Sequence, residues 1–194
     1  SALTISTECI DPVTPEPHLI GFDAIAIVVP VANTWASSLQ ISEVERILWS
    51  NGTGLRWSDL RREWPADEIT VIGPSCSAAS CRMLDMMIPR HRLPAAATSM
   101  VGVDAAVARI AAPPAAVGWI PLACGEGLRG RVRAVSIDNQ RGETVEASFD
   151  RVRAGAYPLA TPLYLVTPPA SARSRLLDHF VEYVVRHRGR LATL

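Results

Sequence analysis

The sequence contains no lysine, because all 19 of its basic residues are arginines. Chemistry that needs an amine side chain, such as a Schiff base or the lysine of a phosphate-binding P-loop, is therefore excluded. Net charge is also lacking, since 19 acidic residues balance the 19 arginines at pH 7. A neutral chain has no overall field that attracts nucleic acid or an anionic membrane, so neither is an expected partner.

Long apolar runs are missing as well. No run approaches the ~20 consecutive apolar residues that a membrane-spanning helix needs, so we predict a chain that does not span a membrane. The first residues, Ser1 to Thr4, include neither a methionine nor a charged-then-apolar leader. This start is typical of a processed or trimmed product. The 194 residues suffice for one ordinary domain or two small lobes.

The four cysteines lack the spacing of a metal site. Cys9, Cys76, Cys81 and Cys124 form no Cys-x-x-Cys pair and have no histidine nearby, so we expect neither a metal nor another cofactor. Their even number fits disulfides in an exported protein, with free buried thiols as the alternative. Sequence proximity favours a bridge from Cys76 to Cys81, and Cys124 to Cys9 is the candidate for a second one.

One strand–loop–helix stretch, residues 68–85, is the centre of the chain's chemistry. A β-branched run at 69–72 predicts a strand that ends at Gly73 and Pro74, and helical spacing of apolar residues begins at Met83. Unpaired backbone N–H groups at such a helix start suit an anion. A plain connection with Ser77 or Ser80 as N-cap is the alternative, which the local residues alone favour. The candidate anion loop consists of small residues: Ser75, Ser77, Ala78, Ala79 and Ser80.

Cys76 and Cys81 also raise an enzyme hypothesis, because a thiol near a helix N-terminus has a lowered pKa and can act as a nucleophile. The sequence places no general base beside either cysteine, and nucleophilic catalysis needs an activating group. We therefore expect a protein that is not an enzyme and has no catalytic residues.

Strands and helices alternate along the chain, which predicts an α/β fold. The apolar run at 20–29 is typical of a strand buried on both faces, and apolar residues at helical spacing predict an amphipathic helix at 172–187. Further strands are expected at 116–124, 132–137 and 157–166, and further helices at 42–48, 57–64, 83–88, 104–111 and 149–153.

The predicted strands at 20–29 and 157–166 bracket the middle of the chain. We expect a leading segment and crossing strand at 1–29, a compact α/β lobe at 30–155, and a return strand with the C-terminal helix at 156–194. The C-terminal helix should pack with the two crossing strands and not on the strand at 69–72.

Several blocks of the sequence are similar to one known family. Trp57, Trp64 and Pro65 form a Trp-x6-Trp-Pro block, and residues 157–164 read Tyr-Pro-Leu-x-x-Pro-Leu-Tyr. Together with the runs at 23–29, 33–36, 69–74 and 116–119, these blocks resemble the periplasmic phosphate-binding proteins of ABC transporters in order and spacing. The resemblance implies a type II periplasmic-binding-protein-like fold with a mixed or parallel sheet and an incomplete first lobe. It also implies a periplasmic or otherwise exported location.

The loop departs from that family's pattern. Where the family has Ser-Gly-Thr, preceded by an aspartate and often an arginine, this chain has Ala78, Ala79 and Ser80, preceded by uncharged residues. Each lost hydroxyl or charge-assisted contact at a desolvated phosphate site costs about 1.5–3 kcal/mol. The family also has a further stretch before the position of Cys9, which supplies the other half of its phosphate cage. These departures imply that the fold is kept and that tight phosphate binding is lost.

Two hypotheses of function remain. The first is a non-catalytic domain outside the cytoplasm, repurposed as a structural or interaction subunit with a protein partner and at most weak binding of phosphate or another oxyanion. The second is a functional phosphate- or oxyanion-binding protein of an ABC transporter whose N-terminal part is absent from this chain. In that case the loop's serines and N–H groups would hold the anion.

Overall fold

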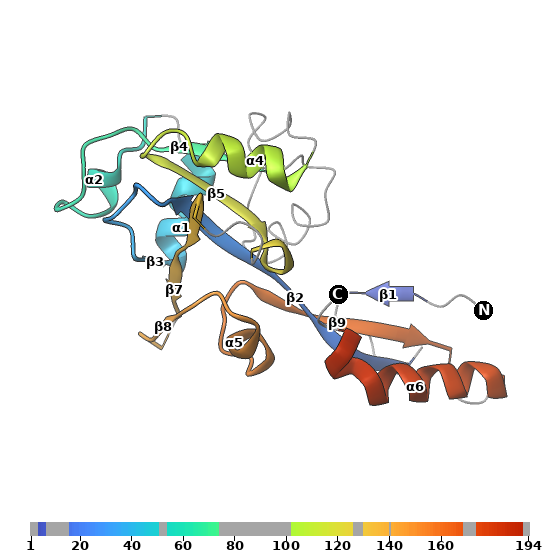
Figure 1. The fold of residues 1–194 in the computed structure, drawn as a ribbon. Coiled ribbons are helices and arrows are strands. Elements are labelled where there is room, and N and C mark those ends of the chain that lie inside the picture. The colour runs from blue at the N-terminus through green and yellow to red at the C-terminus, as the bar shows by residue number, and fades with distance from the viewer. Residues whose placement is uncertain are drawn as a thin grey trace. The chain divides into compact units, whose positions relative to one another are not determined.

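The computed structural model describes residues 4–6, 16–50, 54–73, 102–125, 130–139, 141–168 and 174–191, which form the predicted α/β fold with mixed sheets (Figure 1). The chain packs as two compact units. Ala24–Ala160 is called the central unit here, and Ser1–Asp23 with Thr161–Leu194 the terminal unit. The boundaries expected at 29/30 and 155/156 stay a prediction about domains. The helix expected at 83–88 lies outside the described residues.

Strand β2 (Glu16–Pro30) is at the centre of the sheet in the central unit. It pairs antiparallel with β5 (Ala116–Pro121) and with β6 (Val132–Ala134), and β4 (Thr70–Ile72) lies parallel to β5. Residues 24–29 are at most 5% exposed. This burial explains the unbroken apolar run in the sequence, because a strand covered on both faces needs apolar side chains on both.

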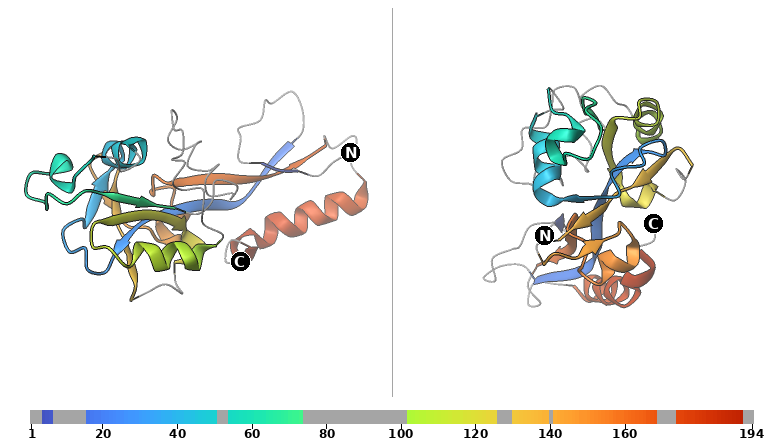
Figure 2. Two further views of the ribbon diagram at one scale, coloured as in Figure 1. Left: turned by 90° about the horizontal axis from the view of Figure 1, so that it is seen from above. Right: turned by 90° about the vertical axis from the view of Figure 1, so that its left-hand side faces the viewer.

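Helices α1 (Ile41–Ser50) and α4 (Val103–Ile110) lie on opposite sides of these strands, as the left view of Figure 2 shows. On the α1 side, Ile47 and Leu48 line a small space with Val71 and Val117. On the other side, the Ile110 side chain lies directly over Gly118. Both helices confirm the spacing-based predictions, since each presents an apolar stripe to the sheet.

The strand predicted at 132–137 is wrong in one respect, because the chain changes partners within it. Strand β6 ends at Ala134, and β7 (Ser136–Asp138) belongs to a second sheet. There β7 pairs parallel with β3 (Ser38–Gln40) and antiparallel with β8 (Thr144–Val145). The switch occurs at Val135, whose N–H donates to the Ile27 carbonyl at 2.8 Å, whereas the Ser136 N–H donates to the Ser37 carbonyl at 3.2 Å.

Three other predicted elements need smaller corrections or none. Strand β5 ends at Pro121 and not at 124, and a 3-10 turn (Leu122–Cys124) follows, because proline has no N–H to extend the ladder. Of the helix expected at 57–64, only one turn forms, α2 (Trp57–Leu60). Helix α5 (Phe149–Arg153) is as predicted, and the Ser148 hydroxyl caps it by accepting the Arg151 N–H at 3.4 Å.

In the terminal unit, β9 (Ala160–Thr167) lies between β1 (Thr4–Ser6) and the first half of β2. Helix α6 (Arg175–Leu191) packs on these strands (Figure 1). A small core joins Val181 and Val184 of α6 to Leu165 of β9, with Ile20 of β2 packed against them. The predicted C-terminal helix and its packing on both crossing strands are therefore confirmed.

Replacing Gly118 with alanine should destabilise the protein strongly. A Cβ atom there would lie 2.2 Å from the Ile72 carbonyl oxygen and 2.4 Å from Ile110 Cδ1, and the backbone oxygen cannot move without breaking the β4–β5 pairing. We expect the free energy of unfolding, measured by urea denaturation, to fall by about 1–3 kcal/mol. The control is Gly102→Ala, where nothing lies within 4 Å of the added atom; an equal effect of both changes would contradict this packing.

Stability should fall at high pH because of Tyr157. Its hydroxyl donates to the Ile25 carbonyl at 2.9 Å, and burial raises the pKa of Tyr157. The unfolded chain ionises this group near pH 10 while the folded chain keeps it neutral. The stabilisation is therefore complete below about pH 10 and is lost as the pH rises further, by up to about 1.4 kcal/mol per pH unit. Tyr157→Phe should flatten this part of the pH profile of unfolding, and the exposed Tyr183→Phe should leave it unchanged.

Candidate functional site

The edge of the sheet where β4 ends is the place where the sequence predicts an anion site. Strands β4 and β5 run parallel and end at this edge, and ligands of open α/β sheets bind at the carboxyl ends of such strands. The described chain stops here at Gly73. The predicted loop lies outside the described residues, so its role stays a prediction: Ser75, Ser77, Ala78, Ala79 and Ser80.

At Gly73 a neighbouring indole ring leaves no room for a side chain. A Cβ atom at this position would lie 2.0 Å from Trp119 Cζ2 and 2.4 Å from Cε2. Trp119 is fully buried in β5, opposite Ile27 of β2. The glycine before the candidate loop is thus explained by packing against Trp119, and no ligand is needed to account for it.

The indole N–H groups of the central unit differ in their hydrogen bonds. Trp57 Nε1 donates to the Ala115 carbonyl at 3.1 Å. Trp35 Nε1 and Trp119 Nε1 are buried, and neither has an acceptor within the described part of the chain. Trp57 also packs edge-on against Trp35, with ring centroids 6.1 Å apart, and against Trp64 at 5.5 Å. The Trp-x6-Trp-Pro block is therefore part of an aromatic cluster.

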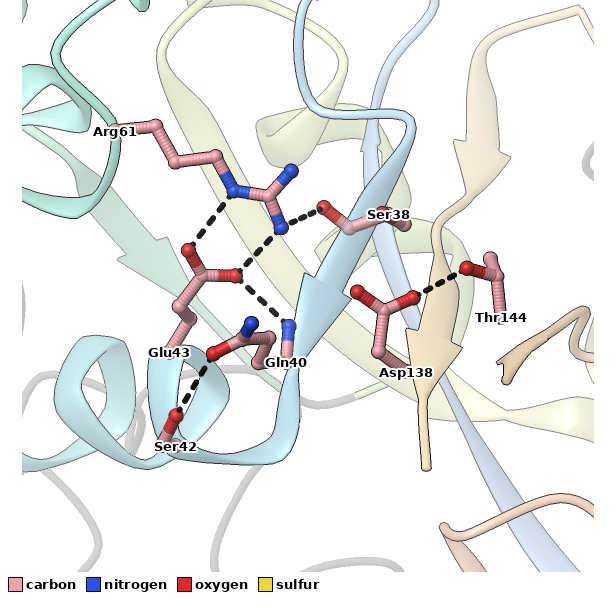
Figure 3. Close-up of polar contacts among 7 residues, drawn as sticks. All are labelled: Ser38, Gln40, Ser42, Glu43, Arg61, Asp138 and Thr144. Carbon is pink, nitrogen blue, oxygen red and sulfur yellow. Dashed lines mark hydrogen bonds and ion pairs between the residues drawn. The ribbon is translucent and has the colours of Figure 1, made fainter. Parts of the chain in front are cut away.

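Glu43 and Arg61 form an ion pair that has several further hydrogen bonds (Figure 3). Arg61 Nε donates to Glu43 Oε1 at 3.0 Å, and Nη2 donates to Oε2 at 2.9 Å and to the Ser38 carbonyl at 3.3 Å. The Gln40 N–H donates to Glu43 Oε2 at 2.8 Å, and the guanidinium lies 4.6 Å from the Trp64 ring. The hydrogen bond to Glu43 raises the pKa of Arg61, against the opposing effect of burial. The pair joins β3, α1 and the α2 segment, and both carboxylate oxygens are used in doing so.

Arg133 is a second arginine with a structural task. Its Nε and Nη2 atoms donate to the Asn33 carbonyl at 3.1 and 2.6 Å, and Nη2 also donates to the Ala36 carbonyl at 3.0 Å. Burial lowers the pKa of Arg133. The fully buried Asn33 side chain accepts the Ala36 N–H at 3.1 Å and donates to the Pro114 carbonyl at 3.3 Å. These bonds fix the loop between β2 and β3, which the sequence could show only as an unstructured segment.

The hollows that described residues of the central unit border include two of several hundred Å³. One, of about 510 Å³, is polar and borders α1 and β7; its walls include Ser42, Glu45 and Asp138. Asp138 Oδ1 accepts the Thr144 hydroxyl at 2.6 Å, and the Ser42 hydroxyl donates to Gln40 Oε1 at 3.5 Å (Figure 3). The other, of about 770 Å³, is mainly apolar and lies between β2, β6 and α5, with Arg153 at its border. Sequence reasoning missed both, because no local pattern brings these distant residues together.

The structure tests only part of the cysteine prediction. Cys124 is exposed and is a free thiol, which does not support the candidate bridge to Cys9. Cys9, Cys76 and Cys81 lie outside the described residues, so the favoured Cys76–Cys81 bridge stays a prediction. Among the residues that the structure describes, no three metal-ligating side chains of histidine, cysteine, aspartate or glutamate are grouped, and no helix is long and apolar enough to cross a membrane.

Residues 16–188 match the family model described as the PBP superfamily domain, so the chain belongs to this family. The mixed α/β fold agrees with that assignment. More narrowly, the chain is a phosphate-binding-protein-like domain, as the curated relatives and the solved structures below indicate, and the resemblance seen in the sequence is confirmed.

The curated relatives include the phosphate-binding protein PstS of Staphylococcus epidermidis, 20% identical over 174 residues, and the protein SphX of Synechocystis, 24% identical over 180 residues. The matches cover 89% and 90% of this chain and 53% of each relative. The chain thus spans about half the length of the curated relatives that it matches.

The solved structures similar to this chain include a possible phosphate-binding protein from Planctomyces limnophilus and an ABC-type phosphate transport receptor from Vibrio cholerae. Both give a TM-score of 0.77, at 19% and 16% identity. The matches cover 96% and 98% of this chain and 71% and 76% of the other chains. At these identities the comparison establishes the fold.

The two tryptophans with different N–H environments should respond differently to replacement by phenylalanine. Both changes remove the same part of a buried ring, but only Trp57→Phe also breaks the hydrogen bond to Ala115. We expect Trp57→Phe to lower the free energy of unfolding by about 1 kcal/mol more than Trp119→Phe does. Urea denaturation of the two variants measures the difference, and an equal or larger loss for Trp119→Phe would contradict this expectation.

Proposed function

We propose that this chain is a non-catalytic, phosphate-binding-protein-like domain that works outside the cytoplasm as a structural or interaction subunit, with tight phosphate binding lost. The observation that carries the proposal is the composition of the loop after β4. Ala78, Ala79 and Ser80 stand where the family has Ser-Gly-Thr, and no aspartate or arginine precedes them between Pro74 and Ser77. A dianion needs several charge-assisted or hydroxyl donors to offset its loss of hydration, each worth about 1.5–3 kcal/mol.

The polar clusters of the central unit support a role without catalysis. Glu43 and Arg61 bind each other and the backbone around them, and Arg133 binds two backbone carbonyls. Charged groups engaged in this way hold loops and helices in place, and they offer no nucleophile paired with a base. These contacts support a scaffold role for the central unit.

A second candidate function is oxyanion binding as part of an ABC transporter. This candidate is favoured by the names of similar proteins, which include a phosphate-binding protein and a phosphate transport receptor. In this case the anion would be held by backbone N–H groups and by the serines of the loop, Ser75, Ser77 and Ser80. The two candidates differ in one measurable quantity, the affinity for the anion.

Isothermal titration of the purified chain with phosphate and with sulfate tests the proposal. We expect no phosphate binding with a dissociation constant below about 10 µM at neutral pH. Tighter binding by the unmodified chain would establish the second candidate instead.

A variant can test whether the loop is the cause. The combined change Ala78→Ser, Ala79→Gly and Ser80→Thr restores the family's residues and should tighten phosphate binding by at least about tenfold. The control is Ala66→Ser, which adds a hydroxyl at an exposed position elsewhere in the central unit. If the restored variant binds phosphate no better than the control, the loop composition does not explain the weak binding.

A further inference from the structure

Trp119 stands at the point where β4 ends and its neighbour β5 continues. The last pair of this parallel ladder joins Ile72 to Gly118, and β5 extends to Pro121. Trp119 is therefore the first residue of β5 beyond the paired part of β4, and its ring lies against Gly73. Ligands of open α/β sheets bind at the carboxyl ends of parallel strands. The ring thus lies at the edge where the sequence predicts the anion loop.

The Nε1–H group of Trp119 lies close to Gly73. The ring atoms nearest to a Cβ atom added at Gly73 are Cζ2, Cη2 and Cε2, at 2.0, 2.1 and 2.4 Å. Cε2 is bonded to Nε1, and the C–H of Cζ2 and the N–H of Nε1 leave the indole on the same side of the ring. The N–H group therefore lies beside the last described residue before the predicted loop.

This N–H group is a buried donor without an acceptor among the described residues. Trp119 is fully buried, and its Nε1 is one of two buried side-chain nitrogen or oxygen atoms there that have no hydrogen-bond partner, the other being Trp35 Nε1. Trp57 shows the usual arrangement, since its Nε1 donates to the Ala115 carbonyl at 3.1 Å. An unpaired buried donor bears its full desolvation penalty, and a bound ion or a buried water is the usual explanation.

The two segments that meet at this edge contain no charged side chain. Residues 69–81 and 111–125 are all uncharged, so they offer only neutral donors: the indole N–H, serine hydroxyls and backbone N–H groups. The cost of removing an ion from water rises steeply with its charge, and neutral donors offset less of that cost than an arginine does. A dianion is therefore disfavoured, whereas a monovalent oxyanion loses less hydration and gains the same hydrogen bonds.

We propose that Trp119 Nε1 is a hydrogen-bond donor for a small monovalent oxyanion, of the carboxylate or nitrate type, at this edge of the sheet. Such an ion supplies the acceptor that the buried donor lacks. The inference rests on the proposed loss of phosphate affinity and names the ions that the same edge takes instead. The two fail separately, because tight phosphate binding contradicts the proposed function and the absence of a response to monovalent oxyanions contradicts the role of Trp119.

Two-dimensional ¹H–¹⁵N NMR spectra of the ¹⁵N-labelled chain report each indole N–H group separately. The chain has five tryptophans, and the signals of Trp119 and Trp57 are those missing from Trp119→Phe and Trp57→Phe. Titration with sodium formate or sodium nitrate should shift the Trp119 signal in a saturable way, with a dissociation constant of about 1–50 mM. The Trp57 signal should stay in place, because its N–H already has an acceptor.

A Trp119 signal that stays in place up to about 100 mM of either salt, or moves no more than that of Trp57, would overturn the proposal. This is the result expected if a buried water satisfies the N–H group. Sodium sulfate at the same ionic strength tests the preference for a single charge. We expect sulfate to bind at least about tenfold more weakly than formate, and equal binding would overturn that preference.

The variants test whether the N–H group itself takes part in binding. In Trp119→Phe, the backbone N–H signal of Gly73 should need at least about fivefold more formate to reach half of its shift than in the unmodified chain. Trp57→Phe removes the same part of a buried ring at another place and should leave this concentration unchanged. An unchanged affinity in Trp119→Phe would also overturn the proposal.

Discussion

The buried half of β2 is the element on which the central unit depends. Strands β5 and β6 bond to its two sides, and α1 and α4 cover opposite faces of the sheet that it anchors. Two contacts before β9 reach the same segment, because the Ile25 N–H donates to the Leu159 carbonyl at 3.0 Å and the Tyr157 hydroxyl donates to the Ile25 carbonyl at 2.9 Å. A strand bonded and covered in this way must be apolar throughout, which accounts for residues 24–29.

Polar groups of the central unit serve mainly to hold loops against this sheet. Asn33 and Arg133 fix the chain between β2 and β3, and Glu43 with Arg61 fixes β3 against α1. Buried or half-buried charges are stable only when they are bonded on several sides, and these are. We therefore expect ligand selectivity to depend on the side chains of the loop after β4, whose composition is the basis of the proposed loss of phosphate affinity.

The sequence predicted the elements whose signal is local and strong. Burial alone explains the apolar run at 24–29 and the helical spacing of Leu177, Val181 and Val184. Strand β2 and helix α6 could therefore be predicted from the sequence. The change of partners at Val135 could not, because the residues on both sides of it are equally suited to a strand, and only tertiary packing decides which sheet each joins. The same holds for the contacts of Glu43 with Arg61 and of Asn33 with Arg133. Each pair is separated by many residues, so no local sequence pattern predicts it.

Two features of the sequence differ from what the surrounding fold requires: the small residues of the predicted anion loop and the exposed apolar residues of α6. A strand end followed by small residues provides backbone N–H groups for an anion, yet Ala78 and Ala79 leave it poor in side-chain donors. A helix at the boundary of a small core provides one apolar face, yet Leu176, Phe180 and Tyr183 add a second. The first feature is the basis of the proposed loss of phosphate affinity.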